Sequence, residues 1–152
     1  MLRLDFGFMC DIGSLLHDIR PADLTEWQKG TGHQSIREDL SAAIIHPNST
    51  IVTDEAGQCI AAWGVSEKYP GSTIGSAWMV ATNQALRRVH EMHRFFKIGI
   101  REMHERFPII HATAWAENTV HHKWMEHFGF VRQPGIITIH HAPFILFTRR
   151  KQ

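Results

Sequence analysis

The sequence has little of what would build a disulfide framework or attract a polyanion. It has two cysteines and a formal net charge of +1 over 152 residues. Cys10 and Cys59 lie among apolar neighbours and share no metal-type or redox-type spacing, so we expect buried free thiols rather than a disulfide. The balanced charge makes no nucleic-acid partner evident. We expect the basic ending at residues 149–151 to be a solvated tail.

Long apolar runs are also missing. No stretch approaches the ~20 residues that a membrane-spanning helix needs, and Arg3, Asp5 and Asp11 interrupt the start, where a signal peptide would be apolar. We therefore expect no membrane span, and a protein that is made and kept in a cytosol. The length fits one domain over residues 1–152, which would bury roughly 70% of its unfolded surface.

What the sequence does contain is regular apolar periodicity. Strand patterns cover residues 2–8, 50–53, 59–65, 74–81, 109–115, 131–139 and 144–148. Helical patterns cover residues 11–27, 35–45, 89–107 and 118–128, with Pro21 in the first turn of a continuation. In the last helix Val120, Trp124 and Phe128 share one side, which we expect to be core. The order β-α-α-β-β-β-α-β-α-β-β predicts an α/β domain, with a mixed sheet and helices on both faces.

This element order resembles that of the GCN5-related N-acetyltransferases, the GNAT superfamily. Residues 117–131 look like the fourth-helix motif of that family, with Asn118 and the Phe128-Gly129-Phe130 ending at the family's spacing. A closer resemblance is to a GNAT-like branch encoded by tailed phages and prophages, which includes small internal virion proteins of short-tailed phages. Four stretches carry that resemblance, at residues 15–32, 62–65, 74–82 and 118–130.

The resemblance implies a place for acetyl-CoA. In the family, the strand at residues 74–81 diverges from the next strand and offers its backbone to the pantetheine arm, a role that would fall to Met79 and Val80. The diphosphate would rest on the loop from Gln84 to Val89, at a helix start that favours an anion. Small residues usually occupy the positions of Arg87 and Val89, where side chains would crowd the diphosphate. Arg87 and Arg88 could instead pair with phosphate by charge, or lie on a solvated helix start.

The resemblance also locates the acid and base of an acetyl transfer. The position where the family commonly has a proton-donating tyrosine is Met125, and the only tyrosine, Tyr69, falls in a distant loop. No residue of 74–81 supplies a carboxylate base. His111 and Glu117 are the remaining candidates for removing a proton from an amine, with a surface or satisfied core position as the alternative for each.

Histidine is abundant, with 12 residues. His90 and His93 lie one helical turn apart, as do His122 and Glu126, so each pair could place two metal ligands on one face. A zinc site generally needs three or four ligands. We therefore expect no metal.

These observations favour a phage-encoded GNAT-fold protein with an altered or vestigial acetyl-CoA site. Such a protein would act by binding a protein partner, as a virion or morphogenesis component or as a binder of a host protein. It would act in the host cytoplasm or be packaged in the virion. The alternative is an active acetyl-CoA-dependent N-acetyltransferase that modifies a host or phage amine.

Overall fold

The computed structural model describes residues 1–152. One eight-stranded mixed sheet has the strand order β1-β2-β3-β4-β5-β8-β6, with β7 paired to β8. The strands are β1 (Arg3–Phe6), β2 (Ser49–Thr53), β3 (Cys59–Glu67), β4 (Ile74–Ala81), β5 (Ile109–Trp115), β6 (Val131–Arg132), β7 (Ile137–Ile139) and β8 (Ala142–Arg150). Neighbouring strands are antiparallel except β4 and β5, which are parallel.

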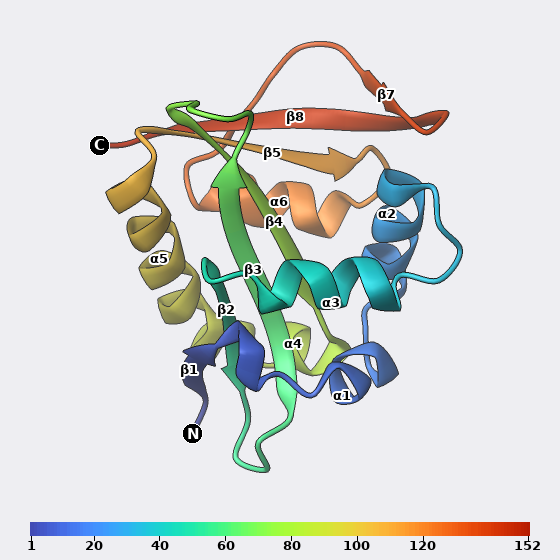
Figure 1. The fold of residues 1–152 in the computed structure, drawn as a ribbon, viewed down its shortest axis with the longest axis vertical. Helices are drawn as coiled ribbons and strands as arrows, with labels where there is room; N and C mark the ends of the chain where they lie inside the picture. Colours follow the sequence, from blue (N-terminus) through green and yellow to red (C-terminus); the bar gives the residue numbers. More distant parts are fainter.

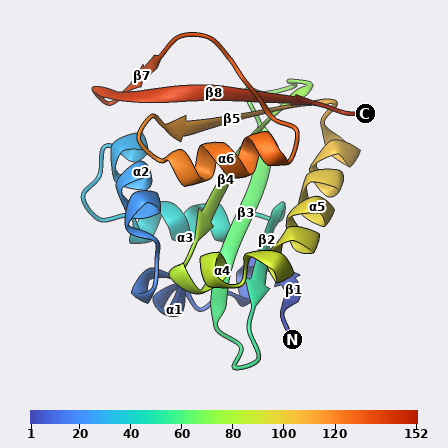
Figure 2. The same ribbon diagram turned by 180° about the vertical axis from the view of Figure 1, so that it is seen from behind.

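Helices cover both faces of this sheet. On one face lie α1 (Ile12–His17), α2 (Pro21–Thr31) and α3 (Arg37–Ile45), as Figure 1 shows. On the other face lie α4 (Asn83–Arg87), α5 (Val89–Arg106) and α6 (Thr119–His127), as Figure 2 shows. Pro21 takes the first position of α2, where a missing N–H is tolerated. Gly32 ends that helix at φ 75°, a conformation that glycine adopts without a steric penalty.

Each face has its own hydrophobic core. The larger core lies under α5 and α6 and includes Met92, Phe96 and Phe147. The smaller core lies under α1 and α3 and includes Leu15, Leu40 and Val80. No helix of the structure is both long enough and apolar enough to cross a membrane.

The parallel strands β4 and β5 separate part-way along their length. Their pairing runs from Ile74 opposite Ile109 to Ala77 opposite Ala112, and neither strand pairs with the other beyond that point. In Figure 1 the two strands visibly diverge, β4 steeply and β5 almost crosswise. The later residues of both strands therefore present one free backbone edge to the space between them.

The predicted mixed α/β fold is confirmed, with corrections to single elements. The helix predicted at residues 11–27 is two helices, α1 and α2, and the short helix α4 precedes the predicted long helix. The first strand ends at Phe6 rather than residue 8, because Gly7 packs against Ser49 and the Ile44 carbonyl and begins the 3-10 turn η1 (Gly7–Met9). Phe6 and Phe8 are 65% and 69% exposed. The strand predicted at residues 131–139 is two short strands, β6 and β7, separated by a segment in which Gly135 has φ 87°.

Two further expectations need correction. The basic ending is not a solvated tail throughout, because Arg149 and Arg150 belong to β8, and Arg149 is only partly exposed. In α6, the expected core residues Val120, Trp124 and Phe128 are only half-buried. The buried residues of that helix are His121, His122 and Met125, because both imidazoles have hydrogen-bond partners inside the protein.

Candidate functional site

An apolar cavity of about 250 Å³ lies where β4 and β5 diverge. Its walls include Met79 of β4, Thr113 of β5 and Trp124 of α6, and helices α2 and α5 close it from the two sides. Fourteen of its 20 lining residues are hydrophobic, so the space suits an apolar group. Its few polar lining groups include Glu26 of α2 and His121 of α6.

Helix α2 supplies partners for the free edge of β4. The indole N–H of Trp27 donates to the Met79 carbonyl at 3.1 Å. The Ala81 N–H donates to the Asp23 carboxylate at 2.8 Å, and the Ala81 carbonyl accepts from the backbone N–H of Arg20 at 3.0 Å. Three strand groups at the divergence, the Met79 carbonyl and the Ala81 N–H and carbonyl, are therefore bonded to the protein itself.

Glu26 of α2 supplies a hydrogen-bond partner for the free edge of β5 and connects that strand to α6. Its Oε1 accepts from the Trp115 N–H at 2.8 Å and from the Asn118 amide at 3.2 Å. The His121 Nδ1 lies 3.1 Å from Oε2 of the same carboxylate. One buried carboxylate thus connects a helix on one face of the sheet with a helix on the other.

Asp23 completes a buried polar network. Its Oδ1 accepts from Arg20 at 2.8 Å and from the Asn118 amide at 3.1 Å, and the Arg20 guanidinium lies 5.6 Å from the centre of the Trp124 ring. All five members of the network are at most 7% exposed: Arg20, Asp23, Glu26, Asn118 and His121. Buried charges need such partners, because an unpaired ion in the interior is strongly disfavoured.

The network shifts the proton affinities of two members. Burial acts to lower the pKa of His121, but the adjacent Glu26 carboxylate, by charge and hydrogen bond, and the charge of Asp23 outweigh it and raise that pKa above its usual value. Burial raises the pKa of Asp23, against the opposing charges of Arg20 and His121. The imidazole of His121 is therefore favoured as a cation paired with Glu26.

The start of α4 already holds a carboxylate from the chain. Asp18 Oδ2 accepts from the Gln84 N–H at 3.0 Å, and the Asp18 carbonyl accepts from the Asn83 N–H at 2.9 Å. Thr82 caps the same turn, because its Oγ1 accepts from the Ala85 N–H. The free N–H groups that make a helix start attractive to anions are thus bonded internally.

The residues predicted to bind a cofactor occupy varied positions. Met79 lines the cavity, whereas Val80 is fully buried in the smaller core on the opposite face. Gln84 donates from its side chain to Asp54 at 3.1 Å. Asn118 lies at the expected helix start, but its side chain serves Asp23 and Glu26 instead of capping the helix.

The two arginines of the predicted diphosphate loop differ from each other. Arg87 is exposed at the end of α4. Arg88 pairs with both carboxylate oxygens of Glu55, at 2.8 and 3.0 Å, and with Glu91 at 2.8 Å, and hydrogen bonds from these two carboxylates raise its pKa. Val89 begins α5, half-buried. Only Arg87 has a guanidinium free of carboxylates.

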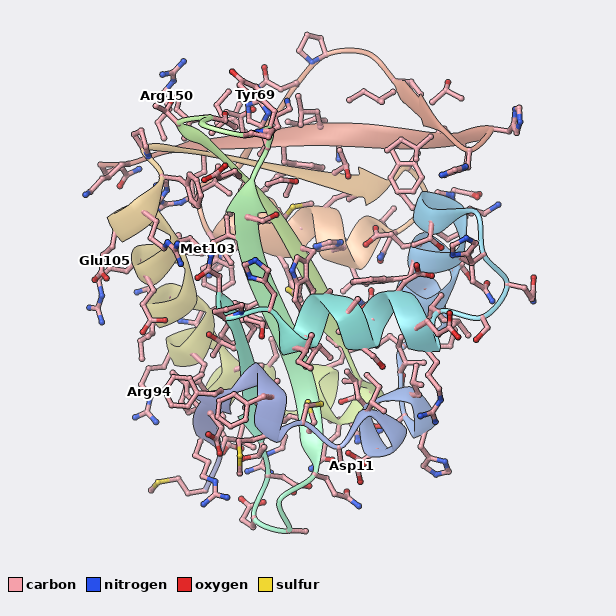
Figure 3. The ribbon with its side chains drawn as sticks, in the orientation of Figure 1. Asp11, Tyr69, Arg94, Met103, Glu105 and Arg150 are labelled. Atoms are coloured by element: carbon pink, nitrogen blue, oxygen red, sulfur yellow. The ribbon has the colours of Figure 1, made fainter.

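The residues predicted to carry acid–base chemistry lie outside the cavity lining. His111 lies where β4 and β5 still pair, opposite Ser76, and its Nδ1 is 2.7 Å from the Lys68 ammonium. Burial, together with the Lys68 charge, lowers the pKa of His111. Glu117 is exposed. Met125 does line the cavity, while Tyr69 is 59% exposed at the end of the molecule where Arg150 lies (Figure 3).

The histidine pairs considered as metal ligands have other neighbours. His93 Nε2 lies 2.9 Å from His127 Nε2. His122 lies 2.9 Å from the Trp115 carbonyl through Nε2, and Arg132 lies beside both His122 and Glu126. No group of three or more histidine, cysteine or acidic side chains that could hold a metal gathers anywhere in the structure.

Sequence reasoning did not identify the polar network at the divergence. Asp23 and Glu26 resemble the polar face of a surface helix in the sequence. Their partners Asn118 and His121 lie 92 to 95 positions further along the chain. One indirect signal was present, because Arg20, Asp23 and Trp27 belong to a stretch that carries the family resemblance. Nothing in that stretch indicated that its polar side chains turn inward.

Comparison with solved structures shows that the fold is the GNAT acetyltransferase fold. Enzymes of this fold use acetyl-CoA. A GCN5-related N-acetyltransferase from Kribbella flavida matches with a TM-score of 0.71 and 14% identity, over 99% of this chain and 98% of that one. The ribosomal-protein-S5-alanine acetyltransferase from Vibrio fischeri matches with a TM-score of 0.65 and 17% identity, over 98% and 91%.

A third structure with this fold is the GNAT domain of S. lividans PAT, with a TM-score of 0.67 and 9% identity over 99% and 89% of the two chains. No model of a protein family matches the sequence, and no curated protein matches it. At these identities the likeness establishes the fold of the chain, and the chemistry must be argued from its own residues.

Proposed function

We propose that this chain is a GNAT-fold protein whose acetyl-CoA site is closed by its own side chains, and that it acts by binding a protein partner. The observation that carries the proposal is the set of hydrogen bonds from α2 to the free edge of β4. Trp27 and Asp23 bond to the Met79 carbonyl and the Ala81 N–H. A pantetheine arm lying between β4 and β5 would have to displace both.

Displacement is costly because the displaced groups are buried. Asp23 is 3% exposed and is held by Arg20 and Asn118 as well. Losing a hydrogen bond to a buried charged group costs about 1.5–3 kcal/mol. That cost would be subtracted from the free energy of cofactor binding.

The diphosphate end of the cofactor meets a second obstacle. Asp18 takes the Gln84 N–H at the start of α4 and carries a negative charge of its own, which repels a diphosphate. Arg88 forms ion pairs with Glu55 and Glu91. At the start of α4 the N–H groups of Asn83, Gln84 and Ala85 are therefore already bonded, and only Arg87 of the two arginines is free of carboxylates.

The kind of partner follows from the resemblance to phage and prophage GNAT-like proteins. That resemblance supports a role as a virion or morphogenesis component, or as a binder of a host protein, in an infected cell. A partner would meet a folded domain with exposed apolar side chains at one end of the sheet, such as Phe6, Phe8 and Met9.

The alternative function is acetyl-CoA-dependent transfer to an amine. One feature favours it, because the apolar cavity at the divergence is lined by the buried Glu26–His121 pair. The Glu26 carboxylate of this pair is the kind of group that accepts a proton from an amine. The two functions differ in whether CoA binds, so a binding measurement separates them.

Calorimetric titration with CoA tests the proposal. We expect wild type to bind with a Kd weaker than about 10 μM, roughly 7 kcal/mol. The double variant Asp18→Ala with Trp27→Phe, which frees the Gln84 N–H and the Met79 carbonyl, should bind CoA about tenfold more tightly than wild type. Glu38→Ala, which removes an exposed charge on α3, is the matched control and should change nothing.

Two results would refute the closed site. One is binding of CoA in the β4–β5 cleft of wild type with a Kd tighter than about 10 μM, which is too strong for a cleft that must first break buried contacts. The other is release of CoA from acetyl-CoA in the presence of an amine, and this second result would establish the transferase alternative. If the double variant gains nothing, then Asp18 and Trp27 are not what keeps CoA out.

A further inference from the structure

A second cavity, of about 660 Å³, lies on the far side of α5 from the β4–β5 divergence. Its walls come from α5, the end of α6 and the end of β8 with the residues that follow it. It shares only Ile100 and Phe128 with the apolar cavity, and no residue of the segment from Gln84 to Val89 lines it. We call this second cavity the basic groove.

Positive charge gathers in the basic groove although the whole chain is nearly neutral. Helix α5 contributes Lys97 and Arg101, and the last residues contribute Arg149 and Lys151, against one acidic side chain, Glu105. None of these four cations takes part in an ion pair. The arginines that do form ion pairs, Arg20, Arg88 and Arg132, all lie outside the groove.

Three histidines line the same groove. His93 and His127 face each other across α5 and α6 with their Nε2 atoms 2.9 Å apart. His104 is 5% exposed, its Nδ1 lies 2.9 Å from the Phe107 carbonyl, and its Nε2 is buried without a protein partner. A buried polar atom without a partner is uncommon in a folded protein, and this one belongs to a residue that lines the basic groove.

We propose that the basic groove binds a ligand that carries two or more linked phosphates. Lys97 and Arg101 are four residues apart on one helix, so they stand about 6 Å apart along the groove. That arrangement suits a row of phosphates, and arginine bonds phosphate oxygens in pairs. The lining contains only two hydrophobic residues. The groove would therefore recognise the phosphates rather than an attached base or acyl group.

Proton uptake is expected to accompany binding. Burial lowers the pKa of His104, and the charges of Arg149 and Lys151 lower it further. A bound anion offsets those charges and favours the imidazolium, so affinity should rise as the pH falls. The other charged or titratable groups on the groove are Lys97, Arg101, Glu105 and His93 of α5 and His127 of α6.

Titration with inorganic tripolyphosphate tests the proposal. Wild type should bind tripolyphosphate at least about tenfold more tightly than it binds inorganic phosphate, because two or more charge-assisted contacts form at once. The double variant Lys97→Gln with Arg101→Gln, both exposed on α5, should lose at least about tenfold in affinity. Arg94→Gln is the matched control, since Arg94 is exposed on the same helix outside the groove (Figure 3).

Adenosine triphosphate serves as a second probe that distinguishes sources of the phosphates. If it binds more tightly than tripolyphosphate, the ligand is a nucleotide; if the two bind equally, a free oligophosphate is sufficient. His104→Asn keeps an N–H donor near the Nδ1 position for the Phe107 carbonyl and should weaken the increase in tripolyphosphate affinity between pH 8 and pH 6. No measurable tripolyphosphate binding, or equal loss in the Arg94 and Lys97/Arg101 variants, would overturn the proposal.

The groove and the closed cofactor site are separable in the same experiments. CoA carries phosphates of its own, so it could enter the basic groove without reaching the β4–β5 cleft. CoA binding that disappears in the Lys97/Arg101 variant belongs to the groove. CoA binding that survives in that variant belongs to the cleft, and it bears on the proposed function alone.

Discussion

At the scale of single residues, the divergence of β4 and β5 depends on charges that are buried in pairs. Glu26 has the most demanding position, because it accepts from the Trp115 backbone, the Asn118 amide and the His121 imidazole while only 7% exposed. A buried pair of this kind is weak evidence of net stabilisation, but removing one partner leaves the other uncompensated. The network should therefore be sensitive to single conservative changes.

We expect Glu26→Gln to destabilise the protein by about 3 kcal/mol, because the charged His121 would lose its counter-ion inside the protein. The amide also has one accepting oxygen where the carboxylate has two. Urea unfolding measures the change in free energy. Glu105→Gln is the control, since Glu105 is exposed on α5 (Figure 3), and it should stay within about 0.5 kcal/mol. A Glu26→Gln cost below about 1 kcal/mol would contradict the assigned role of the network.

Such residues could not be found from the sequence, for a physical reason. Asp23 and Glu26 lie in a helix whose charged residues look solvated, and a charged residue is rarely buried unless it is paired. Here the partners, Asn118 and His121, lie more than 90 positions away. The family resemblance assigned Met79 to the pantetheine arm and Met125 to the position of the usual tyrosine, and both residues line the cavity. It did not predict that polar side chains from α2 fill the rest of the divergence.

At the scale of elements, the sequence predicted what periodicity determines. The strand at residues 74–81 and the strand at residues 109–115 have the predicted bounds, because apolar residues dominate them and glycine, proline or polar residues flank them. Trp124 and Phe128 pack against the larger core, as predicted for that side of α6, but they are only partly buried and line the cavity. The fully buried positions of α6 include two histidines, His121 and His122, which have partners inside the protein. Apolar periodicity indicates only apolar faces, so it could not show that these two histidines are buried.

Helix α5 packs so closely on β3 that glycine is required at one position. A Cβ on Gly99 would lie 2.5 Å from the Trp63 indole nitrogen. Alanine in a helix interior normally gains about 1 kcal/mol over glycine, but overpacking of this kind costs about 1–3 kcal/mol. We therefore expect Gly99→Ala to lower the melting temperature.

Gly30 of α2 is the matched case for that prediction. A Cβ added to Gly30 would lie 3.6 Å from its nearest neighbour, an atom of the Phe144 ring. That distance is an ordinary van der Waals contact. Gly30→Ala should accordingly stabilise the protein by about 0.5–1 kcal/mol. If both alanine variants shift the melting temperature in the same direction, the close approach of α5 to β3 is not what determines the response at Gly99.

At the scale of the whole molecule, α5 and α6 separate two chemically opposite spaces. The cavity on the sheet side is apolar and has the Glu26–His121 pair in its wall, whereas the basic groove on the outer side gathers cations and histidines. Ile100 and Phe128 belong to both walls. The pKa of His121, in the cavity wall, is raised, whereas the pKa of His104, in the basic groove, is lowered. Protonation of these two histidines should therefore change the stability of the folded protein in opposite directions.

We expect the stabilising effect of His121 to depend on pH with a defined sign. Its pKa is raised in the folded protein by the charges of Glu26 and Asp23, which outweigh burial. The stabilisation is therefore fully present below the unfolded pKa of about 6.5, and it is lost as the pH rises through the raised folded pKa. The melting temperature of wild type should exceed that of His121→Gln by more at pH 6 than at pH 9.

The remaining shifted histidines have the opposite sign. The pKa values of His104, His111 and His122 are lowered, in each case mainly by burial, so protonation favours the unfolded chain and stability falls as the pH drops below about 6.5. His121→Gln retains these three and should lose stability on acidification more steeply than wild type. His90→Gln, an exposed change on α5, should follow the wild-type curve. A difference between wild type and His121→Gln that is constant from pH 6 to pH 9 would mean that His121 does not change its charge there, and that the Glu26 pairing is a neutral hydrogen bond.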